Sequence, residues 1–405
     1  MSKLNYSNTY YILVASFALF LPLSRALTSL IAVVLLLVWL IEGDFARKLK
    51  QIVSNNFFII LISYVLLMSI SILWTEDLTT GFSKIQKLCY FLLIFIISTS
   101  LKQIYTNKVI NFFLLGMFVS EIIAYGAFFE LWTFKNATAE YLSPIMHHTH
   151  YSIFMAVTSI ILLNRLFLCN YNLKEKIFFL LFFLTVTGNL FLAPGRTGQV
   201  ALIAGIIIMT LIHFRLTIKS MLISILLISS IYLTAYSISD TFKNRISVGL
   251  SDIKKLEKLD FSSSLGIRVA YWLTSYDSMM ENPFGYGIGD YQIAINDQLD
   301  RKKYNMIKGY AREFMLTHQP HSQYLLTLLQ IGFLGLSLLF ILIIYMFKIK
   351  IIDIEMKKLS ILFTVIFFVS CIPESLFNFH YSLFLYILFT SLFSIYTIQE
   401  SGKNT

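Results

Sequence analysis

Histidines in this chain gather where apolar runs begin. His147, His148 and His150 precede one such run, and His318 and His321 precede another. An imidazole can accept a proton near neutral pH, so a histidine at such a position could serve as a general base. His321 is the candidate catalytic base and His318 a secondary candidate, although each could equally be a polar residue of an ordinary loop. The spacing matches no known zinc motif and no cysteine lies nearby, so we predict no metal site.

Two arginines could bind an anionic substrate. Arg196 lies between two strongly apolar runs, in the segment PGRTG at positions 194–198. An arginine so close to hydrocarbon is costly unless it meets an anionic partner or reaches the membrane interface, and the flanking glycines permit close approach of a backbone or a ligand. Snorkelling to the interface is the alternative explanation. Arg268 opens a helical pattern over 266–272, and its spacing favours neither function nor a solvated helix face.

Three carboxylates also occupy positions of interest. Asp77 and Glu374 lie at the ends of apolar runs and are alternative candidates for the base. Glu121 falls near the middle of an apolar run, where a carboxylate is either functional or a buried, hydrogen-bonded group. The sequence contains no DxD triplet, P-loop or G-x-S-x-G motif, which would mark nucleotide-dependent or serine-hydrolase chemistry. We therefore predict no cofactor.

Composition determines which elements must position these residues. The 405-residue chain is 57% hydrophobic and 13% charged, whereas a soluble domain carries about 25% charged residues. These values exclude a soluble enzyme, and the 37 Phe and 23 Tyr with only 6 Pro exclude a disordered or collagen-like chain. The net charge of +10 could suggest nucleic acid, but in a membrane chain Lys and Arg mark cytoplasmic loops. The sequence thus predicts an all-α polytopic membrane protein that binds no nucleic acid.

About twelve transmembrane helices are predicted, since a span needs about 20 mostly apolar residues. They run approximately over residues 8–23, 26–42, 57–74, 86–101, 109–131, 151–168, 177–193, 199–214, 218–238, 322–347, 359–373 and 381–398. This divides the chain into helices one to nine within 1–238, a large loop at 239–320, and helices ten to twelve within 321–405. Apolar residues at helical spacing early in the loop predict an amphipathic helix lying on the membrane, and a second helix is predicted over 266–280.

Basic residues predict the orientation of these helices. If the N-terminus is cytoplasmic, the inner segments hold sixteen Lys and Arg residues and the short outer segments hold five. Short cytoplasmic loops carry an excess of basic residues. Both termini are therefore predicted to be cytoplasmic, and the loop 239–320 is predicted to face outward. No nucleoside triphosphate is expected on the outer face, so a transferase there needs a donor that is already activated.

Three outer segments together resemble the O-antigen ligase family, whose superfamily also holds O-antigen polymerases and protein O-oligosaccharyltransferases. The segments are 193–198, 265–272 with the trailing turn 282–289, and 318–325 with the following Gly332 and Gly335. Their order, spacing and common side make the match specific over residues 190–340. Ser322 stands where the family usually has Asn after the histidine, and Gly195 stands where Ser or Thr often precedes the first arginine. These departures leave the subfamily open.

The resemblance implies a glycosyltransferase of the bacterial inner membrane with its active face in the periplasm. It implies an undecaprenyl-pyrophosphate-linked glycan as donor, lipid A-core as acceptor, and no metal or nucleotide. Arg196 and Arg268 match the arginines that bind the pyrophosphate, and His321 matches the essential histidine. One dominant outer loop and about 400 residues favour a ligase. An O-antigen polymerase using the same donor is the alternative, and a lipid-linked sugar transporter is the alternative from another class.

Overall fold

The computed structural model describes residues 6–135, 137–138, 141–143, 145–168, 170–215 and 217–401. Every regular element in this part of the chain is a helix, and the one β-type contact is an isolated bridge between Phe134 and Ala137. The prediction of an all-α protein is confirmed.

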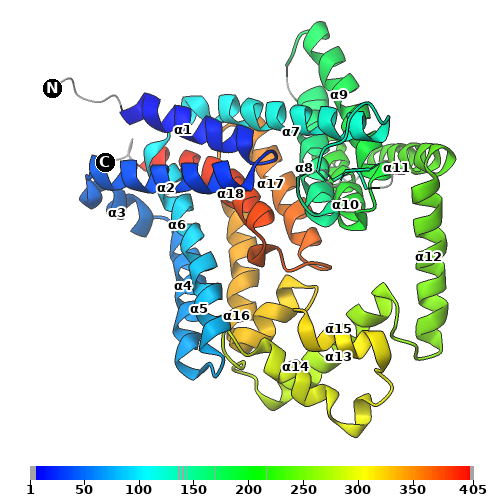
Figure 1. The fold of residues 1–405 in the computed structure, drawn as a ribbon. Coiled ribbons are helices and arrows are strands. Elements are labelled where there is room, and N and C mark those ends of the chain that lie inside the picture. Colours follow the sequence, from blue (N-terminus) through cyan, green and yellow to red (C-terminus); the bar gives the residue numbers. More distant parts are fainter. Residues whose placement is uncertain are drawn as a thin grey trace.

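Helices follow one another closely along the chain (Figure 1). Those before the predicted loop are α1 (Tyr6–Phe20), α2 (Arg25–Glu42), α3 (Phe45–Val53), α4 (Asn56–Ile70), α5 (Leu78–Leu88), α6 (Leu92–Ser100), α7 (Thr106–Phe128), α8 (His148–Leu168), α9 (Leu173–Leu192), α10 (Arg196–Phe214) and α11 (Ile218–Ile238). The loop region holds α12 (Asp240–Glu257), α13 (Ser264–Glu281), α14 (Tyr291–Leu299) and α15 (Gly309–Thr317). The chain continues with α16 (Gln323–Lys348), α17 (Ile354–Ser370), a short 3-10 helix η5 (Leu376–Asn378) and α18 (His380–Ser401).

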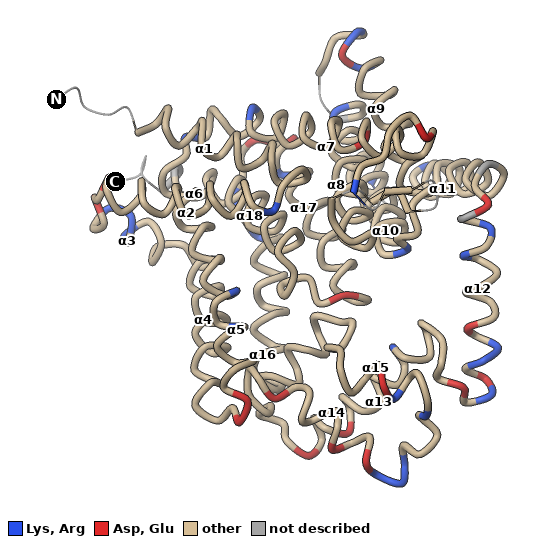
Figure 2. Tube along the Cα trace, viewed as in Figure 1, with Lys and Arg blue, Asp and Glu red and all other residues tan. Residues whose placement is uncertain are grey.

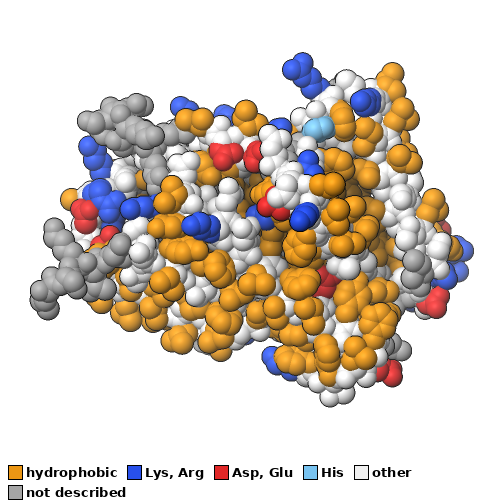
Figure 3. All heavy atoms as spheres, turned by 90° about the horizontal axis from the view of Figure 1, so that it is seen from above, with side chains coloured by type: hydrophobic (Ala, Val, Ile, Leu, Met, Phe, Trp, Pro, Cys, Tyr) orange, Lys and Arg blue, Asp and Glu red, His pale blue; other side chains and the backbone are white. Residues whose placement is uncertain are grey.

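Ten helical segments of the described chain are long and apolar enough to cross a membrane. The polytopic class is therefore confirmed, although by this measure the structure has two fewer spans than the predicted twelve. The two remaining predicted spans correspond to α1 and α17, which have only 15 and 17 residues. Broad apolar areas cover the face seen in Figure 3. Such areas are expected where lipid, not water, surrounds a protein.

Charge is distributed unevenly over these elements. The tube in Figure 2 is almost free of charged residues along α16 and α18, whereas acidic and basic residues alternate along α12 and cluster around α13 to α15. The spans α8 and α18 are the most enclosed, with 89% of each apolar window buried inside the protein. Both enclosed helices begin with a histidine, His148 in α8 and His380 in α18. Imidazole side chains therefore lie at the ends of the two most buried helices.

The helix α16 is broken inside the apolar region, and the break is where two of the motif segments meet. Gly332 has φ +63°, and the turn 282–289 packs against it. The backbone N–H of Tyr286 donates to the carbonyl of Leu329 over 2.8 Å, which satisfies a group that the broken helix leaves without an internal partner. A Cβ on Gly332 would lie 2.0 Å from the carbonyl oxygen of Pro283. Glycine is therefore required there by both conformation and space.

Candidate functional site

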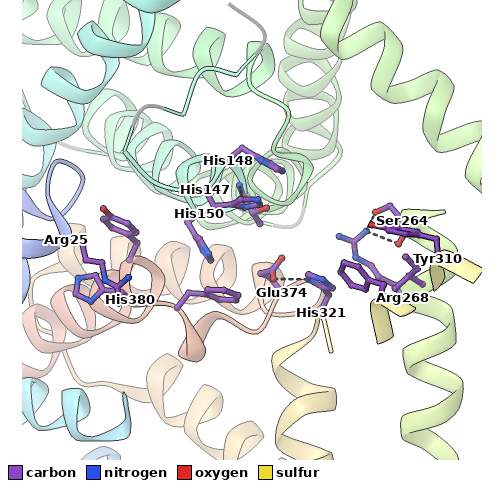
Figure 4. A pocket seen from close by; sticks show the side chains of 15 residues that line it. Arg25, His147, His148, His150, Ser264, Arg268, Tyr310, His321, Glu374 and His380 are labelled. Carbon is purple, nitrogen blue, oxygen red and sulfur yellow. Dashed lines mark hydrogen bonds and ion pairs between the residues drawn. The ribbon is translucent and has the colours of Figure 1, made fainter. Parts of the chain in front are cut away.

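A cavity of about 680 Å³ opens where α2, α8, α13, α15, α16 and α18 approach one another. Among the described residues, the His, Arg and carboxylate side chains that line it are shown in Figure 4: Arg25, His147, His148, His150, Arg268, His321, Glu374 and His380. The two arginines carry permanent positive charges that face a single carboxylate. Such a cavity favours anionic ligands.

His321 and Glu374 form a hydrogen-bonded pair inside this cavity. The Nδ1 atom of His321 lies 3.0 Å from Oε1 of Glu374, and the dashed line in Figure 4 marks this contact. The Glu374 side chain is only 8% exposed, while that of His321 is 28% exposed. A carboxylate that accepts from Nδ1–H fixes the tautomer and leaves Nε2 as the proton acceptor. This arrangement is the one that a general base with an orienting group requires.

The backbone around the pair holds both partners in place. Ser322 caps α16, and the N–H of Gln323 donates to the carbonyl of Glu374 over 3.2 Å. The Gln323 side chain in turn accepts the N–H of Phe377 over 3.0 Å. The ring of Phe314 on α15 stacks against the imidazole of His321, with ring centroids 5.6 Å apart. The contacts with Glu374 and Phe314 together fix the orientation of the imidazole toward the cavity.

The surroundings keep Glu374 ionised. Burial raises the pKa of this carboxyl, but the hydrogen bond from His321 and the positive charges of His321, His150 and Arg268 outweigh burial and bring the pKa below its usual value. Glu374 therefore remains an acceptor for Nδ1–H. It is also placed to stabilise the imidazolium that forms when His321 takes a proton.

Arg268 reaches the same cavity from the first turn of α13. Its Nη1 donates to Oγ of Ser264 over 2.8 Å, and within the described chain its buried Nε has no hydrogen-bond partner. Burial lowers the pKa of Arg268, but a guanidinium still keeps its charge at any physiological pH. An anion bound in the cavity would supply the missing acceptor for Nε–H.

Arg196 lies near Arg268 but does not line the cavity. It begins α10, and its guanidinium faces α12, where a Cβ on Gly249 would lie 3.8 Å from Nη1. The charge of Arg196 lowers the pKa of Arg268, although less than burial does. The glycines that flank Arg196 serve backbone packing, because a Cβ on Gly198 would lie 2.1 Å from the carbonyl oxygen of Ser152 on α8. The structure thus brings both predicted arginines to one region.

Sequence reasoning missed a third arginine in this region. Arg245 lies on α12, one helical turn before Gly249, and its pKa is lowered first by burial and then by the charge of Arg196. His147 also faces the cavity, where burial lowers its pKa. No spacing in the sequence marks Arg245, because its relation to Arg196 arises only when α12 packs beside α10. The sequence alone assigned no specific role to the histidines before α8.

Three of the candidates from the sequence lie outside the lining. His318 is exposed, and its Nδ1 lies 2.8 Å from Oγ1 of Thr317. Asp77 caps α5 by accepting the N–H of Thr80 over 3.0 Å, and these hydrogen bonds lower its pKa. Glu121 is buried on α7, away from this cavity, and within the described residues both of its carboxyl oxygens lack a partner. The structure therefore brings Glu374, and neither Asp77 nor Glu121, to His321.

The residues that the structure describes contain no group of three or more His, Cys, Asp or Glu side chains arranged to hold a metal ion. The five histidines of the cavity are distributed along it, with aromatic rings such as Phe379 packed against His150.

Residues 180–340 match the family model described as O-antigen ligase. This is the family that the three motif segments indicated. The O-antigen ligase region runs from α9 into α16 and contains Arg196, Arg268 and His321. The histidines before α8 and Glu374 lie outside it, so the cavity combines the O-antigen ligase region with helices on both sides of it. A comparison with curated proteins finds no match.

Proposed function

We propose that this membrane protein is an O-antigen ligase that transfers a glycan from undecaprenyl pyrophosphate to lipid A-core. The observation that carries the proposal is the His321–Glu374 pair in a cavity that Arg25 and Arg268 also line. The family match supports an enzyme of the O-antigen ligase or polymerase type. Lipid A-core as the acceptor is part of this proposal and does not come from the family match.

The proposed reaction is a displacement at the first sugar of the donor. Nε2 of His321 takes the proton from an acceptor hydroxyl, and the hydroxyl oxygen forms a bond to the anomeric carbon. The bond between that carbon and the pyrophosphate oxygen breaks, and its electron pair leaves with undecaprenyl pyrophosphate. Arg268, with Arg196 and Arg245 nearby, stabilises the charge that develops on the leaving group. The lipid tail of the donor can lie between the membrane helices.

A deletion strain tests this function against its alternatives. Loss of a ligase leaves free lipid A-core together with accumulated lipid-linked polymer. Loss of a polymerase leaves core capped by a single repeat. Retention of the lipid-linked glycan on the cytoplasmic face would instead identify a transporter, a function that neither the gathering of polar groups in one cavity nor the family match supports.

We propose that residues 239–320 lie in the periplasm and that both termini are cytoplasmic, in the inner membrane of a bacterium. The bias of basic residues supports this orientation. In this orientation the cavity would open to the periplasmic face, where the proposed donor is used. In a variant without the three native cysteines, an impermeant maleimide should label Asp260→Cys but not Lys350→Cys in intact spheroplasts. Both positions are exposed on the protein, so the reverse labelling pattern would mean that the orientation is wrong.

A further inference from the structure

The cavity has a second cationic end that the proposed donor site does not use. In Figure 4, Arg25 and His380 lie on one side of the Glu374–His321 pair, and Arg268 lies on the other. Nothing in the displacement described above involves Arg25 or His380. Two cationic ends with one base between them indicate that each end receives a different anionic group.

The residues at this second end form a defined cluster. Arg25 is the first residue of α2, and Nε2 of His380 lies 3.1 Å from Oγ1 of Thr28, one turn further along the same helix. The ring of His380 is fixed from its other side by Phe384, with ring centroids 4.0 Å apart.

The charge of this cluster is not neutralised by the protein. Within the described part of the chain, Arg25 forms no ion pair with a carboxylate. Among the described residues that line the cavity, Glu374 is the one carboxylate, and it is already bonded to His321. A guanidinium without a counter-charge in its site stabilises an anion that binds beside it.

Displacement chemistry assigns the two ends to different substrates. In a direct displacement, the attacking oxygen approaches the anomeric carbon from the side opposite the leaving group. If the leaving pyrophosphate lies at Arg268, the acceptor must enter from the opposite side of His321, where Arg25 lies. An acidic group on the acceptor would therefore meet Arg25 while its hydroxyl reaches Nε2 of His321.

We propose that Arg25, beside His380, forms an anion subsite that binds a phosphate or carboxylate group of the acceptor glycolipid. This inference rests on the proposed function, because it assumes that a glycolipid acceptor attacks a donor held at Arg268. It deepens that function by naming the end of the cavity from which the acceptor enters and the chemical group by which it is recognised.

Steady-state kinetics on the purified full-length protein test the subsite. The assay uses nanodiscs of phosphatidylcholine, with lipid A-core as acceptor, either intact or with its acidic groups removed. Losing a charge-assisted contact should raise the KM for intact acceptor at least about tenfold in Arg25→Gln, with the KM for donor unchanged. Arg25→Lys should retain part of the effect, because an ammonium keeps the charge but not the planar fork. Lys135→Gln, which changes an exposed basic residue outside the cavity, should match the wild type.

The decisive comparison is between the two acceptors. Removal of the acidic groups should raise the KM of the wild type and should have no further effect on Arg25→Gln. Equal sensitivity of both proteins to that removal would overturn the subsite while wild-type turnover upholds the proposed function. A change in the donor KM of Arg25→Gln would also overturn the subsite, since Arg25 would then contact the donor. If the assay is repeated in nanodiscs with anionic lipid and Arg25→Gln has an effect only there, the subsite is overturned because Arg25 would then contact a membrane headgroup. A wild-type protein that transfers no glycan to lipid A-core would overturn the proposed function and the subsite together.

Discussion

Replacing His321 by alanine is expected to reduce the rate of glycan transfer by about 10²–10⁴-fold, the usual contribution of a general base. An acceptor hydroxyl is a poor nucleophile until its proton is removed, and Nε2 of His321 is the acceptor that the Glu374 contact leaves free. The variant should still bind the lipid-linked donor, because the arginines remain in place. Single-turnover assays with donor in excess, combined with a direct donor-binding measurement, separate these two effects.

His318→Ala is the matched control for this prediction. His318 lies on the same loop, but its ring is exposed and does not line the cavity, so the variant should lose much less activity. Glu374→Gln should fall between the two, since the amide can still accept Nδ1–H but removes the charge that stabilises the imidazolium. If a partly active His321→Gln variant keeps the acidic limb of the wild-type pH–rate profile, another group is the base, and Glu374 becomes the first candidate.

The helices were predictable because hydrophobicity alone determines them. A membrane span must satisfy its backbone polar groups internally, so an apolar run of sufficient length has almost no alternative to a helix. Two of the predicted spans, α1 and α17, show the limit of this argument, because a count of apolar residues cannot give the length of regular helix that forms. The break in α16 at Gly332 could not be predicted from hydrophobicity either. It depends on a turn about 50 residues earlier that supplies the missing hydrogen bonds.

The candidate site was predictable only where a local motif exists. Arg196, Arg268 and His321 each lie in a recognisable segment, and the structure places all three at or beside one cavity. The partner of His321 could not be assigned, because Asp77 and Glu374 occupy equivalent positions at the ends of apolar runs. Only the hydrogen bonds from the start of α16 to the turn before η5 distinguish them. Arg245 and Arg25 carry no motif at all, and their proximity to the site follows from packing between distant helices.

Arg268→Ala is expected to reduce transfer about a hundredfold, since losing one electrostatic contact to a developing negative charge costs on the order of 3 kcal/mol. Arg268 lines the cavity with a buried Nε that has no partner among the described residues and an Nη1 fixed by Ser264. Arg268→Lys should recover only part of this loss, because an ammonium cannot bind two phosphate oxygens in the plane of a guanidinium. Arg301→Ala provides the control, because that arginine also lies within residues 239–320 but pairs with Glu281 away from the cavity.

The combination of Arg268→Ala with Arg196→Ala shows whether the two arginines act on one pyrophosphate. Arg196 does not line the cavity, although its guanidinium faces α12 nearby, so binding of one ligand by both arginines is the expectation that the combination tests. If they bind the same leaving group, the loss in the double variant should be smaller than the product of the two single losses, because the first substitution already misplaces the pyrophosphate. Multiplicative losses would indicate two separate roles. Full activity of both single variants at normal protein levels would remove both arginines from the donor site and leave Arg245 as the residue to test.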